Sequence, residues 1–462
     1  MNVRILIFVL VVIFFTTTAK AQDTLRLEDV ISIVIENNFD IHVAKNNIQV
    51  SINNNNIGLV GGGQSTGGTV SGGTTGMLPQ ISIAAGSPNN PLGFGNTIST
   101  LKYDEATVPG QPSPNINRAS LWSSSYTPTI IGTWYFFDGL KMFATKKKLN
   151  RAVDLTNIQY RIAVENALLA ALSAYYQMIS IEQYIKSLKV TLQLGEYQKQ
   201  LADLKSTTGT GSGVEVLQTQ IDYNNIEVQI LQQQNLLNEQ RVNLNNLLKR
   251  SPDMEFHVPA TIEVKTKPEY ETALAATFAN NNTIRQNKKT VEIDELGVKE
   301  FKGNRYPKIG ITGNYTYQSI SNSEGILRLN ENWGWDAGFI FSWTLLNNLT
   351  TNTAIKNQIM QVKSDMLRTE ASKLLAHANL YKAYISFKNN LTIMDIETKS
   401  VQLASQNLEI ASQRYKQGAA NYIEYHTVEQ SYENAQYRLS QASYNTKVSE
   451  LNYLKEQGLL VY

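Results

Sequence analysis

Few residues in this chain could carry covalent or metal chemistry. The 462-residue sequence contains no cysteine, which excludes disulfides, thiolate metal ligands and a cysteine nucleophile. The four histidines, His42, His257, His377 and His426, are scattered without the spacing of a metal site. The carboxylates are spread along helical patterns and no Ser/His/Asp grouping recurs. We therefore expect no enzyme activity, no metal and no cofactor.

Glycine-rich segments are the next candidates for chemistry. Gly209-Thr-Gly-Ser-Gly213 follows a helical pattern, whereas a phosphate-binding loop follows a strand. The segment from Gly58 to Gly76 is rich in glycine, asparagine, serine and threonine, and no Gly-Lys-Ser/Thr closes it. We interpret it as a flexible insertion without chemistry.

The overall charge excludes a further class of partner. Lysine and arginine number 41 and aspartate and glutamate 39, so the chain lacks the basic excess that nucleic-acid binding requires. A hydrophobic content of 42% is too high for a wholly disordered protein.

The first residues predict export. Asn2 to Arg4 is basic, Ile5 to Phe15 is uninterrupted apolar sequence, and Ala19-Lys20-Ala21 offers a small-residue cleavage site. A membrane anchor is the alternative, but a spanning helix needs about 20 apolar residues. We predict a signal peptide over residues 1–21 and a mature chain that works outside the cytoplasm.

Long proline-free stretches predict long helices. No proline occurs from Thr129 to Ser251 or from Lys308 to Tyr462. Apolar residues recur there at three- and four-residue spacing, as in Leu168, Ala171, Leu172, Tyr175 and Ile179. On this evidence alone a helical bundle or coiled coil is the leading interpretation.

Four short segments alternate with period two and predict strands instead. One segment begins at Ile81, a second ends at Phe137, a third begins at Ile309, and the fourth covers residues 333–343. In the last segment the apolar positions are mostly aromatic, which favours lipid contact over a soluble antiparallel sheet. The residues predicted to face lipid are Trp333, Trp335, Phe339, Phe341 and Trp343.

The chain is predicted to be a tandem repeat. Asp138 and Asn347, Gly209 and Gly418, and Glu215 and Glu424 are all separated by 209 residues. We place the first repeat at 22–250, a linker at 251–268 and the second repeat at 269–462. Two repeats provide four strands, too few to enclose a transmembrane barrel, so several chains would have to share one.

The order of these motifs resembles the TolC-like outer-membrane efflux proteins, from about Leu25 to Gly458. The resemblance rests on motifs that recur in order, namely Leu78-Pro-Gln-Ile81, Phe137-Asp-Gly139, Arg414-Tyr-Lys-Gln-Gly418 and Tyr422-Ile-Glu-Tyr425. It implies an α+β membrane protein whose long helical hairpins form a periplasmic tunnel. Each chain would contribute four strands to a trimeric, twelve-stranded outer-membrane β-barrel.

The resemblance also implies a function and its sites. The protein would be a passive exit duct of a tripartite efflux or type I secretion system, in contact with a periplasmic adaptor and, through it, an inner-membrane pump. The expected docking residues at the hairpin tips are Lys205, Gly209, Gly211, Gly213, Tyr415, Gly418 and Ala420. Three copies of Glu424, with Glu215 nearby, would form a cation-favouring pore constriction.

Three departures from the family pattern affect the tip. An arginine that can follow the tip glycine by two positions is Ala420 here, a second acid that can follow the first by three is Thr427, and Ser206 replaces the tip tyrosine in the first repeat. A closed tip would therefore need other contacts. The alternative function is a periplasmic or surface coiled-coil protein without transport activity, and the sequence does not indicate a cargo.

Overall fold

The computed structural model describes residues 24–59, 77–85, 93–99, 119–259, 261–322, 329–347 and 349–460. The expected signal peptide lies outside these residues, as does the glycine-rich insertion apart from Gly58 and Leu59, which are helical. The chain forms two compact units. The first contains residues 1–47, 157–287 and 368–462, and the second contains 48–156 and 288–367. Each unit therefore draws on both predicted repeats.

Helices dominate the chain. Their bounds are α2 Leu27–Asn37, α3 Phe39–Leu59, α4 Lys141–Thr207, α5 Gly213–Leu247, α6 Tyr270–Asn280, α7 Asn282–Gly303, α8 Thr350–Lys416 and α9 Tyr422–Glu456. Helices α4 and α8 have 67 residues each, and α5 and α9 have 35 each. By length and composition, one helix among the described residues, α4, has a stretch that could span a membrane, and 56% of that stretch is buried in the fold.

One antiparallel sheet belongs to the second unit. Its strands are β1 Gln80–Ala85, β2 Gly93–Ser99, β3 Ala119–Tyr126, β4 Pro128–Phe137, β5 Lys308–Asn322 and β6 Leu329–Ser342. Six strands are assigned where the sequence predicted four. However, β3 and β4 pair with β5 in one register and are separated only by Thr127. The break falls beside Pro128, which has no N–H to donate to the ladder.

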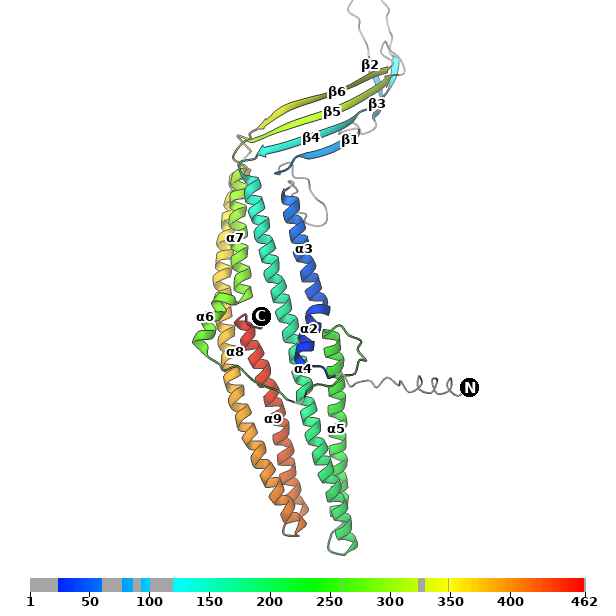
Figure 1. The fold of residues 1–462 in the computed structure, drawn as a ribbon, viewed down its shortest axis with the longest axis vertical. Coiled ribbons are helices and arrows are strands. Elements are labelled where there is room, and N and C mark those ends of the chain that lie inside the picture. Colours follow the sequence, from blue (N-terminus) through cyan, green and yellow to red (C-terminus); the bar gives the residue numbers. More distant parts are fainter. Residues whose placement is uncertain are drawn as a thin grey trace, which may run out of the picture. The chain divides into compact units, whose positions relative to one another are not determined.

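The six strands therefore occupy four rows across the sheet. Strands β1 and β2 pair with β4 and β3, β5 forms the third row and β6 the fourth. Figure 1 shows β1, β4, β5 and β6 side by side in this order. Among the described residues, the outer edges of the first and fourth rows have no strand partner.

The two faces of the sheet differ in chemistry. Trp134, Ile311 and Phe339 lie opposite one another in register and therefore share a face. Their neighbours Thr133 and Thr312 share the other face. The apolar face also contains Ile81, Ile83, Ile130, Tyr315, Trp333, Trp335 and Phe341. The other face contains Ser82, Thr129, Asn314, Thr316 and Asp336, with Ile131 and Ile340 as apolar exceptions.

The predicted lipid-facing residues of β6 are thus on one face. Phe339 is 88% exposed in the single chain and Trp335 is 79% exposed, so none of the described residues covers this face there. Trp343 lies just beyond the strand, where its indole Nε1 donates to the Arg305 carbonyl oxygen at 3.1 Å.

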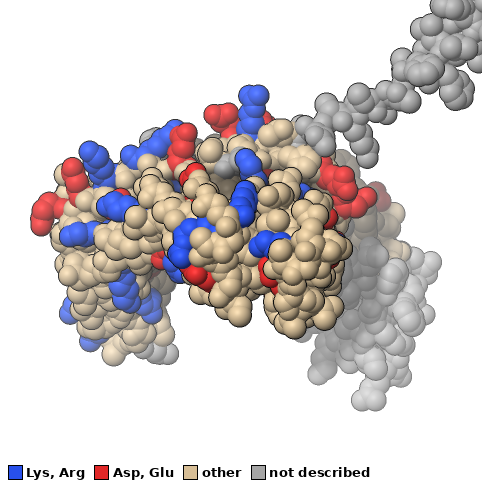
Figure 2. All heavy atoms as spheres, turned by 90° about the horizontal axis from the view of Figure 1, so that it is seen from below, with Lys and Arg blue, Asp and Glu red and all other residues tan. Residues whose placement is uncertain are grey.

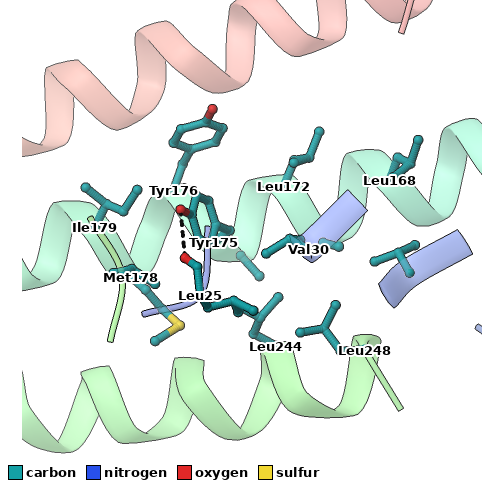
Figure 3. Packing of buried hydrophobic residues seen from close by; sticks show 14 of the residues in the cluster. Leu25, Val30, Leu168, Leu172, Tyr175, Tyr176, Met178, Ile179, Leu244 and Leu248 are labelled. Carbon is teal, nitrogen blue, oxygen red and sulfur yellow. Dashed lines mark hydrogen bonds between the residues drawn. The ribbon is translucent and has the colours of Figure 1, made fainter. Parts of the chain in front are cut away.

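The core of the first unit confirms the apolar stripe predicted on α4. Leu168, Leu172, Tyr175 and Ile179 are buried against α2, α5 and the segment around Phe256 (Figure 3). The Tyr175 hydroxyl donates to the Leu25 carbonyl oxygen at 3.2 Å, which satisfies its buried polar atom. Burying each large apolar side chain contributes about 1.5–3 kcal/mol, so this stripe fixes α4 against its neighbours.

Candidate functional site: the paired hairpin turns

The first hairpin turn joins α4 to α5 through a glycine with left-handed backbone. Gly209 has φ +73°, its N–H donates to the Ser206 carbonyl at 3.2 Å, and the Thr210 N–H donates to the Lys205 carbonyl at 2.9 Å. These two bonds form a Schellman motif, which satisfies the last carbonyls of a helix. Ser212 then caps α5 by accepting from the Val214 N–H.

The second hairpin turn, from α8 to α9, has the same backbone design. Gly418 also has φ +73°, and the N–H groups of Gly418 and Ala419 donate to the carbonyls of Tyr415 and Arg414. Asn421 caps α9 by accepting from the Glu424 N–H at 2.9 Å. A Cβ added to Gly209 or Gly418 would meet nothing within 4 Å, so backbone conformation and not space requires glycine there.

The other predicted tip residues have different environments. Gly211 lies so close to Lys205 that an added Cβ would be 2.8 Å from the lysine Cβ, whereas Gly213 opens α5 with free space around it. Ala420 occupies in the second turn the place that Gly211 has in the first. Large apolar side chains beside the turns are exposed, a feature that the sequence reasoning missed; they are Leu204, Val214, Leu217 and Ile423.

The end of the molecule that carries these turns has no charge of one dominant sign. Basic and acidic side chains are interspersed there, and uncharged surface occupies most of the area between them (Figure 2).

A tyrosine joins the two hairpins. The Tyr415 hydroxyl donates to Glu215 Oε1 at 2.5 Å. Lys205 Nζ lies 3.9 Å from the centre of the Tyr415 ring and 4.0 Å from Glu215 Oε1. Burial raises the pKa of Tyr415, so the phenol remains protonated and can donate this bond. The structure thus brings Lys205, Glu215 and Tyr415 together.

A buried polar cluster lies one heptad along α5 from Glu215, where Asp222 meets the first turn of α9. The Tyr422 hydroxyl donates to Asp222 Oδ2 at 2.8 Å, and the His426 ring stacks on Tyr422 with centroids 5.7 Å apart. His426 Nδ1 lies 3.6 Å from Asp222 Oδ2 and 3.5 Å from Glu429 Oε2. The sequence reasoning missed this cluster, although Glu215 and Asp222 are seven residues apart, as are Tyr415 and Tyr422.

Burial and like charge shift the acid–base behaviour of this cluster. Burial, with the nearby Glu429 carboxylate, raises the pKa of Glu433 to about 7. The pKa of His426 is raised chiefly by its interaction with Glu429, against the opposing effect of burial. Even so, within the described residues no three histidine or acidic side chains are arranged to hold a metal ion.

Glu424 is exposed and paired within its own hairpin. Arg414 Nη1 lies 2.6 Å from Glu424 Oε1, and Arg414 Nη2 donates to the Ala419 carbonyl at 3.4 Å. The arginine of the second turn is therefore Arg414, four positions before Gly418, whereas the family pattern can have one two positions after this glycine. The pore roles of Glu424 and Glu215 depend on three chains and stay predictions.

The fold defines a class of protein. The structure is similar to VceC from Vibrio cholerae, with TM-score 0.69 and 16% identity, covering 94% of this chain and 96% of that chain. It is similar to the CmeC outer membrane channel of Campylobacter jejuni, with TM-score 0.70 and 14% identity over 94% and 86%. It is also similar to the open state of the Neisseria gonorrhoeae MtrE outer membrane channel, with TM-score 0.64 and 14% identity over 94% and 90%. This is the fold of outer-membrane channels.

Part of the sequence matches a family model. Residues 274–453 match the sequence model of the family described as outer membrane efflux protein, whereas no curated protein sequence matches the chain. The resemblance to TolC-like outer-membrane efflux proteins is therefore confirmed: these residues belong to that family, and the whole chain shares the fold of its channels. The predicted outer-membrane location is the one that this family has.

Proposed function

We propose that three copies of this chain form one twelve-stranded outer-membrane barrel and a passive exit duct beneath it. The observation that carries the proposal is the sheet: four rows, one apolar aromatic face, one polar face and two outer edges that lack a strand partner among the described residues. Unpaired edges cannot persist in lipid, because their N–H and C=O groups find no water.

Strand pairing between neighbouring chains would remove the unpaired edges. If the β6 edge of one chain pairs with the β1/β2 edge of the next, three chains give twelve strands and leave no free edge. The apolar face would then contact lipid and the polar face would line water. Threonine, serine and asparagine dominate that polar face, so the lining favours no particular cargo and selection would belong to the pump.

The hairpin turns are the docking surface in this proposal. Two turns per chain would place six around one axis, and each ends a long helix at an exposed left-handed glycine. The exposed side chains of Leu204, Val214 and Ile423 beside these turns suit contact with a periplasmic adaptor. The system served could be efflux or type I secretion; the duct itself would be the same.

Disulfide cross-linking tests the barrel directly, because the chain has no cysteine of its own. We would pair Ser82→Cys in β1 with cysteine at Gly334, Asp336 or Gly338 in β6, all on the polar face. One of these pairs should give a covalent trimer on a denaturing gel, and the unmodified trimer should conduct ions in a planar bilayer. The matched control is Ser82→Cys with Asn314→Cys, because β5 is an inner row.

Absence of both cross-linked trimer and conductance would favour the alternative, a coiled-coil protein without transport activity. A pair of arginine variants then tests the faces. Arginine at Phe339 should hinder insertion by about 2–4 kcal/mol if the site is near the bilayer midplane. Arginine at Gly338, on the water-lining face, should be milder.

A further inference from the structure

The junction between sheet and helices in the second unit exposes large apolar side chains. It comprises residues 137–149, 299–309, 341–347 and 349–353, where β4 and β6 lead into α4 and α8 and where α7 leads into β5. Leu346 is 92% exposed and Leu345 is 72% exposed, and Tyr306 and Trp343 are also more than half exposed. Such a concentration of exposed apolar surface marks an interaction site.

Two leucines at this junction have a strained backbone. Leu140 has φ +65° and Leu349 has φ +61°, and each directly precedes the first residue of a long helix. They are 61% and 68% exposed, so packing among the described residues does not account for a large side chain in this conformation. A glycine at either position would relieve this strain. Because a strained leucine occurs at both junctions, the strain points to a function for the side chains themselves.

The same junction is basic. Its three segments contain eight lysines and arginines against two acids, Asp138 and Glu300. Asp138 is buried and accepts from the Met142 N–H, and Glu300 pairs with Lys148 at 2.6 Å. Lys147, Lys299 and Lys302 are exposed and form no ion pair within the described part of the chain. The excess positive charge therefore faces outward.

We propose that this junction, the basic belt, binds anionic phospholipid head groups in the leaflet on the helix side of the barrel. The inference rests on the proposed membrane function. Where the strands end, the apolar face of the sheet would leave the hydrocarbon, and head groups would come next. Lysines at that depth attract anionic phosphates, while Leu140, Leu349 and Leu346 reach into the acyl chains.

Lipid binding by the purified trimer tests the charge. In mixed micelles containing phosphatidylglycerol, Lys147→Gln with Lys299→Gln should lower the affinity roughly fivefold for each lysine removed. The matched control is Lys382→Gln with Lys388→Gln, two exposed lysines of α8 that belong to the first unit. Equal phosphatidylglycerol binding by wild type and belt variant would overturn the proposal.

Replacing Leu140 and Leu349 should raise the stability in detergent and reduce the stabilisation by lipid. Leu140→Gly with Leu349→Gly should raise the melting temperature in detergent, because the left-handed strain disappears. The same variant should lose part of the stabilisation that phosphatidylglycerol nanodiscs give over uncharged ones. A variant that melts lower in detergent, or keeps the full lipid effect, would contradict the proposal. Conductance of the same preparations is a separate readout: a channel that conducts without any lipid effect overturns only the basic belt.

Discussion

The two hairpin turns share a backbone and differ in how they use the same pair of charges. Both have a glycine at φ +73° and a capped returning helix. Lys205 and Glu215 in the first turn occupy the places of Arg414 and Glu424 in the second. In the second turn the base and acid pair directly at 2.6 Å, whereas in the first they are 4.0 Å apart.

The difference has one cause, Tyr415. In the first turn Glu215 accepts from this tyrosine of the other hairpin, and Lys205 lies over its ring. The position of Tyr415 is occupied in the first turn by Ser206, which is too short to return the contact. The second turn is therefore held by its own ion pair, and the first turn is held by the second hairpin. One backbone design thus supports two kinds of restraint.

The largest expected effect concerns the glycines that the two turns share. Gly418→Val should abolish export while leaving the trimer assembled, because valine in a left-handed conformation costs at least about 1–2 kcal/mol and the turn must change shape. Gly209→Val should do the same, since φ is equal. Export assays and unboiled gels measure the two outcomes. Gly418→Asn is the control, because asparagine tolerates this conformation; equal loss with asparagine would mean that bulk, and not φ, matters.

The next effect concerns the buried cluster beneath the turns. The native pKa of Glu433, about 7, is above its ordinary value of about 4.5. Its contribution to stability is therefore present at low pH and is lost as pH rises through 7. The raised pKa of His426 acts in the same direction, and Asp222 and Glu429 are the other charged groups that face it. The packing of the hairpins should loosen between about pH 5 and 8.

Glu433→Gln should remove most of this pH dependence. The free energy of opening that hydrogen exchange measures at α9 amides should then exceed the wild-type value by up to about 3 kcal/mol at pH 8. At pH 5 the two proteins should exchange alike. Because His426 remains, a weaker dependence above about pH 6.5 should persist. A variant with the wild-type pH profile would show that Glu433 is ionised throughout.

A smaller effect is expected at Glu215, the acid of the first turn. Glu215→Gln weakens a hydrogen bond from a buried tyrosine to a carboxylate. The free energy of opening that hydrogen exchange measures at the first turn should therefore fall by about 1–2 kcal/mol. Tyr415→Phe should reproduce this loss. If the double variant loses as much as the two single variants combined, the contact between the hairpins contributes nothing.

The smallest stability effect is expected at the exposed pair. Glu424→Gln should cost less than about 1 kcal/mol, because Arg414 and Glu424 are both about half exposed. Its signature should instead be electrical: weaker cation preference and weaker block by multivalent cations in a planar bilayer. Unchanged selectivity would leave Glu424 only the ion pair and a place near the start of α9.

The sequence predicted the parts of this protein that depend on local pattern. Proline-free stretches with a 3.6-residue period predicted α4 and α8, because a helix needs only its own hydrogen bonds and one apolar stripe. Strict alternation predicted the faces of β5 and β6. Two glycines 209 residues apart predicted both turns, because a left-handed helix end favours glycine whatever surrounds it.

Tertiary structure decided what these parts do to one another. No local pattern shows that Tyr415 reaches Glu215, that Tyr422 and His426 enclose Asp222, or that burial raises the pKa of Glu433. The same holds for the break beside Pro128, which matters only because β5 runs past it, and for the two compact units, each built from both predicted repeats. These features depend on contacts between residues about 200 positions apart, whose energies exist only once the chain has folded.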